Sequence, residues 1–309
     1  MTTGFSELRG AGLIAVRGPD AIAFLHAQLT SEVVGLASSH TQYSGYCTPK
    51  GRLLATFLLW RMDDEIVLQL PESLRADIQA KLAKYLLRAR VELVSATAAF
   101  RLFGVWGSAA ADGLAGIVDA VPQRTHEVVS EENVRVARAP LDRFIVAAAA
   151  ERAEDIRATL RSRMPEEPES AWLQREIEAG VPMVLAETQD RYVPQMLNFD
   201  LLGAVSYTKG CYPGQEVVAR MHYLGRLKQR MYRVHVQTGL PPAPGDALFS
   251  PTFGPDQASG GILYAAPVGG GYDALAVIQT SIVRSEAVHW KSLDGSTVEV
   301  KPLPYTIPD

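Results

Sequence analysis

Cysteine is scarce in this sequence, and long apolar runs are absent from it. Of 309 residues only Cys47 and Cys211 carry thiols, which is too few for a disulfide framework and typical of a reducing compartment. No stretch approaches the roughly 20 apolar residues that a membrane-crossing helix needs, and the first residues contain no apolar signal core. The sequence therefore predicts a soluble cytoplasmic protein with no membrane partner.

Excess charge and metal-ligand clusters are lacking too. The net charge is only −4, so no general positive field attracts nucleic acid. The six histidines are scattered, and none lies two to four residues from another histidine or a cysteine, which is the usual spacing of zinc ligands. We therefore expect no metal site, and nucleic-acid binding requires a local basic patch.

The first hundred residues alternate between strand-like and helix-like patterns. Leu74, Ile78 and Leu82 recur every four residues and so share one helix face. Thr48-Pro49-Lys50-Gly51 has turn chemistry between two β-rich runs, which predicts a hairpin. The expected strands are 13–17, 43–47, 52–60, 66–70 and 91–94, and the expected helices are 21–29 and 74–86.

A second set of elements in a similar order begins near residue 101. Its expected strands are 101–106, 133–138 and 143–146, and its expected helix is 151–163. An acidic linker broken by prolines and a short helix at 171–179 follow. From residue 231 onward, strand-like runs alternate with Gly/Pro turns and no helical period appears, which indicates a small β-domain.

These patterns predict an α+β protein in three parts, because 309 residues exceed a single core. We expect a first α+β module at 1–100 and a second at 101–230. The second contains a distinctive cysteine motif. An all-β domain is expected at 231–309.

The cysteine motif is KGCYPGQE, residues 209–216. Gly210 and Gly214 permit left-handed backbone, and the proline between them stiffens the loop. A free cysteine is usually buried as a small hydrophobe, but this stretch has no apolar period to bury Cys211. Basic neighbours, Lys209 above all, favour a thiolate. A functional thiol and a merely structural turn both fit these residues, and the acid–base role of Glu216 stays open.

The stretch 209–233 is locally basic. It contains six basic residues and one acidic residue, with three tyrosines interleaved. Such a patch suits a polyanion, either RNA or the polyglutamate tail of a ligand. A solvated charged hairpin is the alternative interpretation. Trp172, on the short helix at 171–179, has two interpretations as well: core side chain or aromatic platform for a ligand.

Several segments together resemble the YgfZ family of folate-binding, tRNA-modifying proteins, which is related to the aminomethyltransferase (T-protein) of the glycine cleavage system. The most specific match is KGCYPGQEVVAR. The other similar segments are LIAVRGPDAIAFLHAQLTSEV, TPKGRLLATFLLW, WLQREIEAGVPMV, the run RYVPQMLNFDLLGAVSYTKGCYPGQE and KPLPY. The likeness covers most of the chain.

The resemblance implies a T-protein-like fold: two interlocked ferredoxin-like modules around a central folate cavity and a C-terminal β-barrel. It implies tetrahydrofolate as cofactor. It also implies a role in the synthesis or repair of iron–sulfur enzymes, including those that thiolate tRNA, with iron–sulfur enzymes or assembly proteins as partners. The basic stretch 209–233, and not the resemblance, is where tRNA could be contacted directly.

Motif positions carry over one by one. Cys211 matches the family cysteine, with Lys209 and Glu216 beside it as further catalytic candidates. Gln215, Gly210 and Gly214 are expected to line the cofactor site, together with Trp172, which falls where relatives can place a tryptophan against the folate.

An aminomethyltransferase is the main alternative. T-proteins carry two adjacent acidic residues in the first hairpin, where a carboxylate can manage protons near the folate. The corresponding positions here are Leu54 and Ala55, neither of which can accept a proton. The resemblance therefore favours an accessory protein, and it leaves open both catalytic turnover, such as one-carbon transfer on tetrahydrofolate, and a non-catalytic tRNA-binding scaffold.

Overall fold

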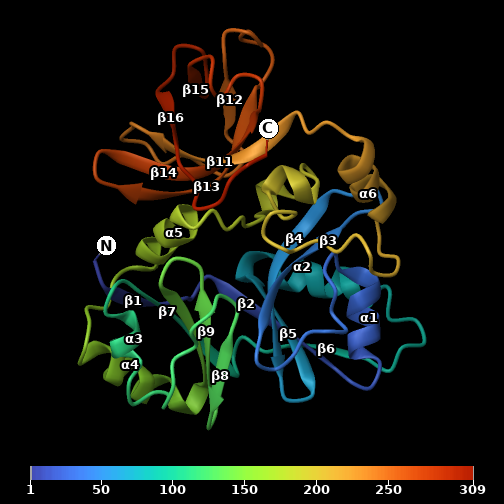
Figure 1. The fold of residues 1–309 in the computed structure, drawn as a ribbon, viewed down its shortest axis with the longest axis vertical. Helices are drawn as coiled ribbons and strands as arrows, with labels where there is room; N and C mark the ends of the chain where they lie inside the picture. The colour runs from blue at the N-terminus through green and yellow to red at the C-terminus, as the bar shows by residue number, and fades with distance from the viewer. Residues whose placement is uncertain (1, 309) are drawn as a thin grey trace. The chain divides into compact units, whose positions relative to one another are not determined.

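The computed structural model describes residues 2–308, which divide into two compact units. Unit 1 contains the chain up to Ala27, Glu32–Tyr43 and Phe57–Trp172. Unit 2 contains Gln28–Ser31, Ser44–Thr56 and the chain from Leu173 onward. Because the chain passes between the units several times, each unit is assembled from segments distant in sequence. The elements of each can be followed by colour in Figure 1.

Unit 1 contains an antiparallel five-stranded sheet covered by short helices. The strands, in their order across the sheet, are β1 (Gly4–Glu7), β7 (Phe100–Trp106), β10 (Arg143–Ala149), β9 (Val134–Ala139) and β8 (Val128–Glu131). The covering helices are α3 (Ala110–Gly113) and α4 (Ala153–Arg161), with the 3-10 turn η1 (Ala150–Arg152) before α4. Ile156 and Leu160 of α4 lie on one helix face and join Phe103 and Val146 of the sheet in one core cluster.

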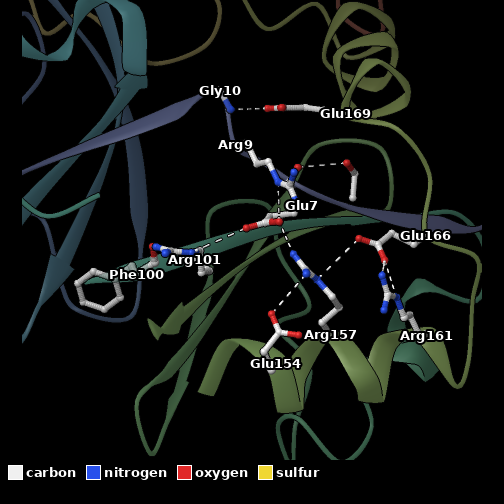
Figure 2. Close-up of polar contacts among 11 residues, drawn as sticks. Glu7, Arg9, Gly10, Phe100, Arg101, Glu154, Arg157, Arg161, Glu166 and Glu169 are labelled. Carbon is white, nitrogen blue, oxygen red and sulfur yellow. Dashed lines mark hydrogen bonds and ion pairs between the residues drawn. The ribbon is translucent and has the colours of Figure 1, made fainter. Parts of the chain in front are cut away.

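A charged network fastens the end of β1 to α4 and β7 (Figure 2). The Glu7 carboxylate accepts hydrogen bonds from Arg9, at 2.8 Å, and from Arg157 of α4. Arg101 of β7 lies 3.9 Å from the same carboxylate, and Arg157 also pairs with Glu166. Because the Glu7 side chain is largely buried, this network satisfies a carboxylate that would be costly to leave unpaired.

A second five-stranded sheet is ordered β3-β4-β5-β2-β6, and its first two strands continue into unit 2. The strands are β3 (Thr41–Cys47), β4 (Leu53–Met62), β5 (Glu65–Pro71), β2 (Ala11–Arg17) and β6 (Glu92–Ser95). Its helices are α1 (Ala21–Gln28) and α2 (Glu72–Ala83). Leu74, Ile78 and Leu82 of α2 are all buried, so the four-residue period identified the packed face.

Unit 2 ends in a closed six-stranded barrel of order β11-β14-β13-β12-β15-β16. The strands are β11 (Gln229–Val236), β12 (Ala247–Phe249), β13 (Gly260–Val268), β14 (Gly271–Gln279), β15 (Val288–Trp290) and β16 (Thr297–Lys301). Val234, Ile262 and Ile278 fill its interior. The α+β class and the C-terminal β-barrel are thereby confirmed.

Short helical segments complete the description. They are α5 (Glu169–Glu178), which runs from unit 1 into unit 2, and in unit 2 the 3-10 turns η2 (Ala186–Thr188) and η3 (Pro194–Leu197) and helix α6 (Gln215–Leu224). Between residues 2 and 308, no helix combines the length and apolar character needed to cross a bilayer.

Candidate functional site

The Cys211 loop, residues 206–214, occupies the irregular stretch before α6 in unit 2. Backbone hydrogen bonds anchor its beginning, since the Ser206 amide donates to the carbonyl of Thr30 at 2.9 Å. The Thr30 hydroxyl in turn donates to the Ala204 carbonyl at 2.7 Å. These hydrogen bonds therefore hold the start of the loop against Thr30, just after the end of α1.

Cys211 is exposed, whereas the other cysteine, Cys47 at the end of β3, is buried. Burial raises the pKa of the Cys47 thiol, which keeps that sulfur protonated and inert. The structure thus separates the two thiols, with Cys211 as the one that a reagent or a partner can reach.

Two glycines in direct contact fix the end of the loop. Gly214 precedes α6 with φ +82°, a left-handed conformation that favours glycine. A Cβ at Gly214 would stand 2.5 Å from the Gly51 Cα and 2.5 Å from the Thr48 carbonyl oxygen. Gly51 has φ +73°, and a Cβ there would stand 2.9 Å from the Cβ of Val217. The turn of the β3–β4 hairpin therefore packs against the start of α6, and only residues without a side chain permit it.

Lys209 points inward rather than toward the thiol-bearing surface. The residue is buried, its Nζ donates to the carbonyl of Leu29 at 2.6 Å, and it lies 5.0 Å from the centre of the Tyr212 ring. An ammonium group bound in this way anchors the loop from below. From the sequence, Lys209 was expected to act on the neighbouring thiol of Cys211. In the structure its ammonium group instead contacts a backbone carbonyl and an aromatic ring.

The other motif residues divide between loop and helix. The Gln215 side-chain amide donates to the carbonyls of Lys209 and Gly210, at 3.3 and 3.5 Å, and so ties the helix start to the loop. Glu216 in the first turn of α6 is exposed and pairs with Arg220 at 2.6 Å. This carboxylate lies on the outer face of the helix, where solvent and one arginine are its neighbours.

Tyr212 carries an unusual polar atom. The residue is 6% exposed, and its hydroxyl has no hydrogen-bond partner within residues 2–308. Burial, followed by the neighbouring Cys47, raises the pKa of this phenol. A buried hydroxyl without a partner costs free energy, so this atom stands out beneath the Cys211 loop. Gln195 Oε1 is a second buried acceptor in unit 2 without a partner among the described residues.

Trp172 lies in unit 1, on the first half of α5, and is 5% exposed. Its ring rests on Gly104, where a Cβ would come within 2.2 Å of the indole. The Arg143 guanidinium lies 4.8 Å from the ring centre and Trp106 lies 6.2 Å away. The indole is therefore a packed side chain of unit 1, and its contact with a folate stays a prediction.

The basic stretch 209–233 presents less charge than its residue count indicates. Arg230 is buried and forms a bidentate pair with Asp200 at 2.7 and 2.9 Å. Arg233 pairs with Asp273 at 2.7 Å. Lys209 donates to the Leu29 carbonyl and Arg220 pairs with Glu216, as described above. Two exposed cations are left, Arg226 and Lys228, and neither has an ion pair within residues 2–308.

Comparison with solved structures shows the fold. The crystal structure of the glycine cleavage system aminomethyltransferase T from Bartonella henselae superposes with a TM-score of 0.77, covering 98% of this chain and 86% of that one at 18% identity. Residues 2–145 match the sequence model described as the GCVT N-terminal domain. The predicted T-protein-like fold is therefore confirmed.

Curated relatives identify the family. A protein of Hamiltonella defensa subsp. Acyrthosiphon pisum (strain 5AT), named tRNA-modifying protein YgfZ, is 32% identical over 240 residues, which are 77% of this chain and 71% of the relative. This chain belongs to the YgfZ family. The protein of the same name from Sodalis glossinidius (strain morsitans) is 27% identical over 304 residues, covering 97% of this chain and 92% of the relative. YgfZ membership thus extends over nearly the whole sequence.

Some residues around the loop were not evident from sequence. Leu29 supplies a backbone carbonyl, which leaves no mark on residue type. Gly51 was noted only as part of a turn, although a glycine ending a hairpin turn is a signal for close backbone approach. Gln195 and Tyr212 became notable only through their buried polar atoms.

Proposed function

We propose that this YgfZ-family protein binds folate and supports the synthesis or repair of iron–sulfur enzymes, including those that thiolate tRNA, with Cys211 as the functional thiol. The observation that carries the proposal is the exposed sulfur on a loop fixed at both ends, in a chain whose relatives are named tRNA-modifying.

The loop geometry supports a chemical role for Cys211. The Lys209 anchor below and the Gly214–Gly51 contact beside it hold the backbone in one place, while the side chain itself is exposed. A fixed and accessible thiol can attack a one-carbon unit, exchange with a partner's disulfide or ligate a transient cluster. In our proposal Glu216, which is exposed in the first turn of α6 and pairs with Arg220, is the further catalytic candidate.

The chemistry of the buried polar atoms is compatible with a pterin. Tyr212 Oη and Gln195 Oε1 have no partner within residues 2–308, and a pterin ring offers N–H donors and ring acceptors that match them. In our proposal Gln215 and the backbone at Gly210 and Gly214 complete the binding surface of the loop. Tetrahydrofolate, when bound, supplies a one-carbon carrier.

An aminomethyltransferase is less well supported. Ala55 is buried in β4 and Leu54 is apolar, so the hairpin offers no carboxylate at either position to exchange a proton with the cofactor. The structural likeness to an aminomethyltransferase is at 18% identity and concerns the fold. Turnover with tetrahydrofolate and a lipoyl-bound aminomethyl donor would overturn this ranking.

Tetrahydrofolate titration followed by tryptophan fluorescence tests the folate part of the proposal. We expect saturable binding to the wild-type protein and a smaller signal change for Trp172→Phe, since this indole is the proposed reporter. A Tyr212→Phe variant tests the polar contact, because it removes only the buried hydroxyl, and it should weaken folate binding. Absence of saturation at millimolar ligand would refute folate binding.

A further inference from the structure

The end of α6 carries an aromatic cluster that the proposed chemistry of Cys211 does not use. Three rings form this cluster, which we call the α6 cap: Tyr207, His222 and Tyr223. The Tyr207 and His222 rings are stacked, with centroids 3.7 Å apart and planes 15° from parallel. Tyr223 meets both rings edge-on, at 6.2 and 4.7 Å. The cap is therefore a packed aromatic structure and not a set of loose side chains.

The cap is open to solvent. Tyr223 is 64% exposed and the adjoining Leu224 is 85% exposed, while Tyr207 is fixed from below by a hydrogen bond from the Gln195 amide at 3.3 Å. Contiguous exposed apolar surface is typical of sites where a protein binds a partner. A stack anchored at its base and exposed at its top can receive another flat ring without rearranging.

The chain segment that follows the cap carries charge of one sign. Arg226 and Lys228 follow directly after the helix, are exposed and have no ion pair within residues 2–308. The sequence has no Asp or Glu between Glu216 and Asp246. An acidic overall charge of −4 makes this unbalanced segment stand out from the rest of the chain.

We propose that the α6 cap with Arg226 and Lys228 binds single-stranded RNA, with an unpaired base stacked on Tyr223 and phosphates held by the two cations. Exposed aromatic rings interleaved with unpaired basic residues are the means by which proteins hold unpaired bases. A protein partner would use the aromatic and apolar area but gives no reason for two unpaired cations in a segment of the sequence without a carboxylate. This inference goes beyond the proposed function and does not rest on the sulfur of Cys211.

The test is fluorescence anisotropy of a labelled 12-nucleotide single-stranded RNA of mixed sequence, titrated with full-length protein at 50 and 200 mM salt. We expect Tyr223→Ala to weaken binding by about 5- to 150-fold, because a base loses its stacking partner. Tyr223→Phe keeps the ring and should keep the affinity. The double variant Arg226→Ala/Lys228→Ala should lower the salt slope by about 1.4, which corresponds to two lost phosphate contacts on a single strand.

Unit 1 offers a matched control. Tyr85 is 46% exposed and lies between the exposed cations Lys84 and Arg88, so Tyr85→Ala and Lys84→Ala/Arg88→Ala remove the same groups elsewhere. These variants should bind RNA like the wild type. Equal losses at both places would show general attraction and overturn the proposal, as would no saturable binding at 50 mM salt. A Tyr223→Ala protein with normal RNA affinity but failed function in cells would make the cap a protein-docking surface instead.

Discussion

The contact between Gly214 and Gly51 makes a quantitative prediction about the Cys211 loop. In Gly214→Ala the new Cβ would lie 2.5 Å from the Gly51 Cα and from the Thr48 carbonyl oxygen. Both atoms are backbone, so neither can turn aside as a side-chain end would. The left-handed φ of +82° adds roughly 1 kcal/mol of strain for alanine, and the overlap adds about 1–3 kcal/mol. We expect a loss of about 2–4 kcal/mol in the free energy of unfolding.

Gly203→Ala separates the two contributions. Gly203 also belongs to unit 2 and has φ +69°, but a Cβ there meets nothing within 4 Å. This variant should lose only the strain of about 1 kcal/mol. Urea unfolding monitored by tryptophan fluorescence measures both variants. Equal losses in the two, or a Gly214→Ala protein as stable as the wild type, would refute the claim that this contact holds the loop.

Three further predictions concern other parts of the chain. Gly104→Ala should displace the indole of Trp172, since the two would overlap at 2.2 Å, and should shift the fluorescence spectrum of the native protein and lower its stability by about 1–3 kcal/mol. Burial, reinforced by His40, lowers the pKa of His126 to about 4. The free energy of unfolding should therefore have its full value above about pH 6.5, the pKa of histidine in the unfolded chain, and fall by about 3 kcal/mol as the pH drops to about 4. His126→Gln should remove this decline in pH-dependent unfolding. In native protein, a disulfide reagent should modify Cys211 at once and Cys47 only after denaturant is added; two fast thiols would contradict the burial of Cys47.

Periodicity and turn chemistry were enough to locate most elements. The buried face of α2 followed from Leu74, Ile78 and Leu82, and the hairpin from Thr48–Gly51, because these patterns depend on local geometry alone. The exposure of Cys211 also followed from local sequence, since its neighbours offer no apolar period. The closed barrel was predicted by the family resemblance, whereas the residue pattern alone indicated only a β-domain.

Long-range packing was not visible in the same way. Residue type does not say which backbone carbonyl an ammonium group will meet, so the inward course of Lys209 toward Leu29 could not be read from the motif. The charge count of 209–233 also overestimated the unpaired positive charge, because Arg230 and Arg233 form ion pairs with carboxylates of other segments. Pairing of this kind depends on tertiary structure, which a local count ignores.

Replacement of each cysteine in turn, in cells that lack the native gene, tests the central claim most directly. Cys211→Ala protein, produced at wild-type level, should fail to restore iron–sulfur enzyme activity and tRNA thiolation, because the accessible sulfur is gone. Cys47→Ala, which removes the buried thiol, should restore both. Full restoration by Cys211→Ala would contradict the account and exclude the thiol from the function.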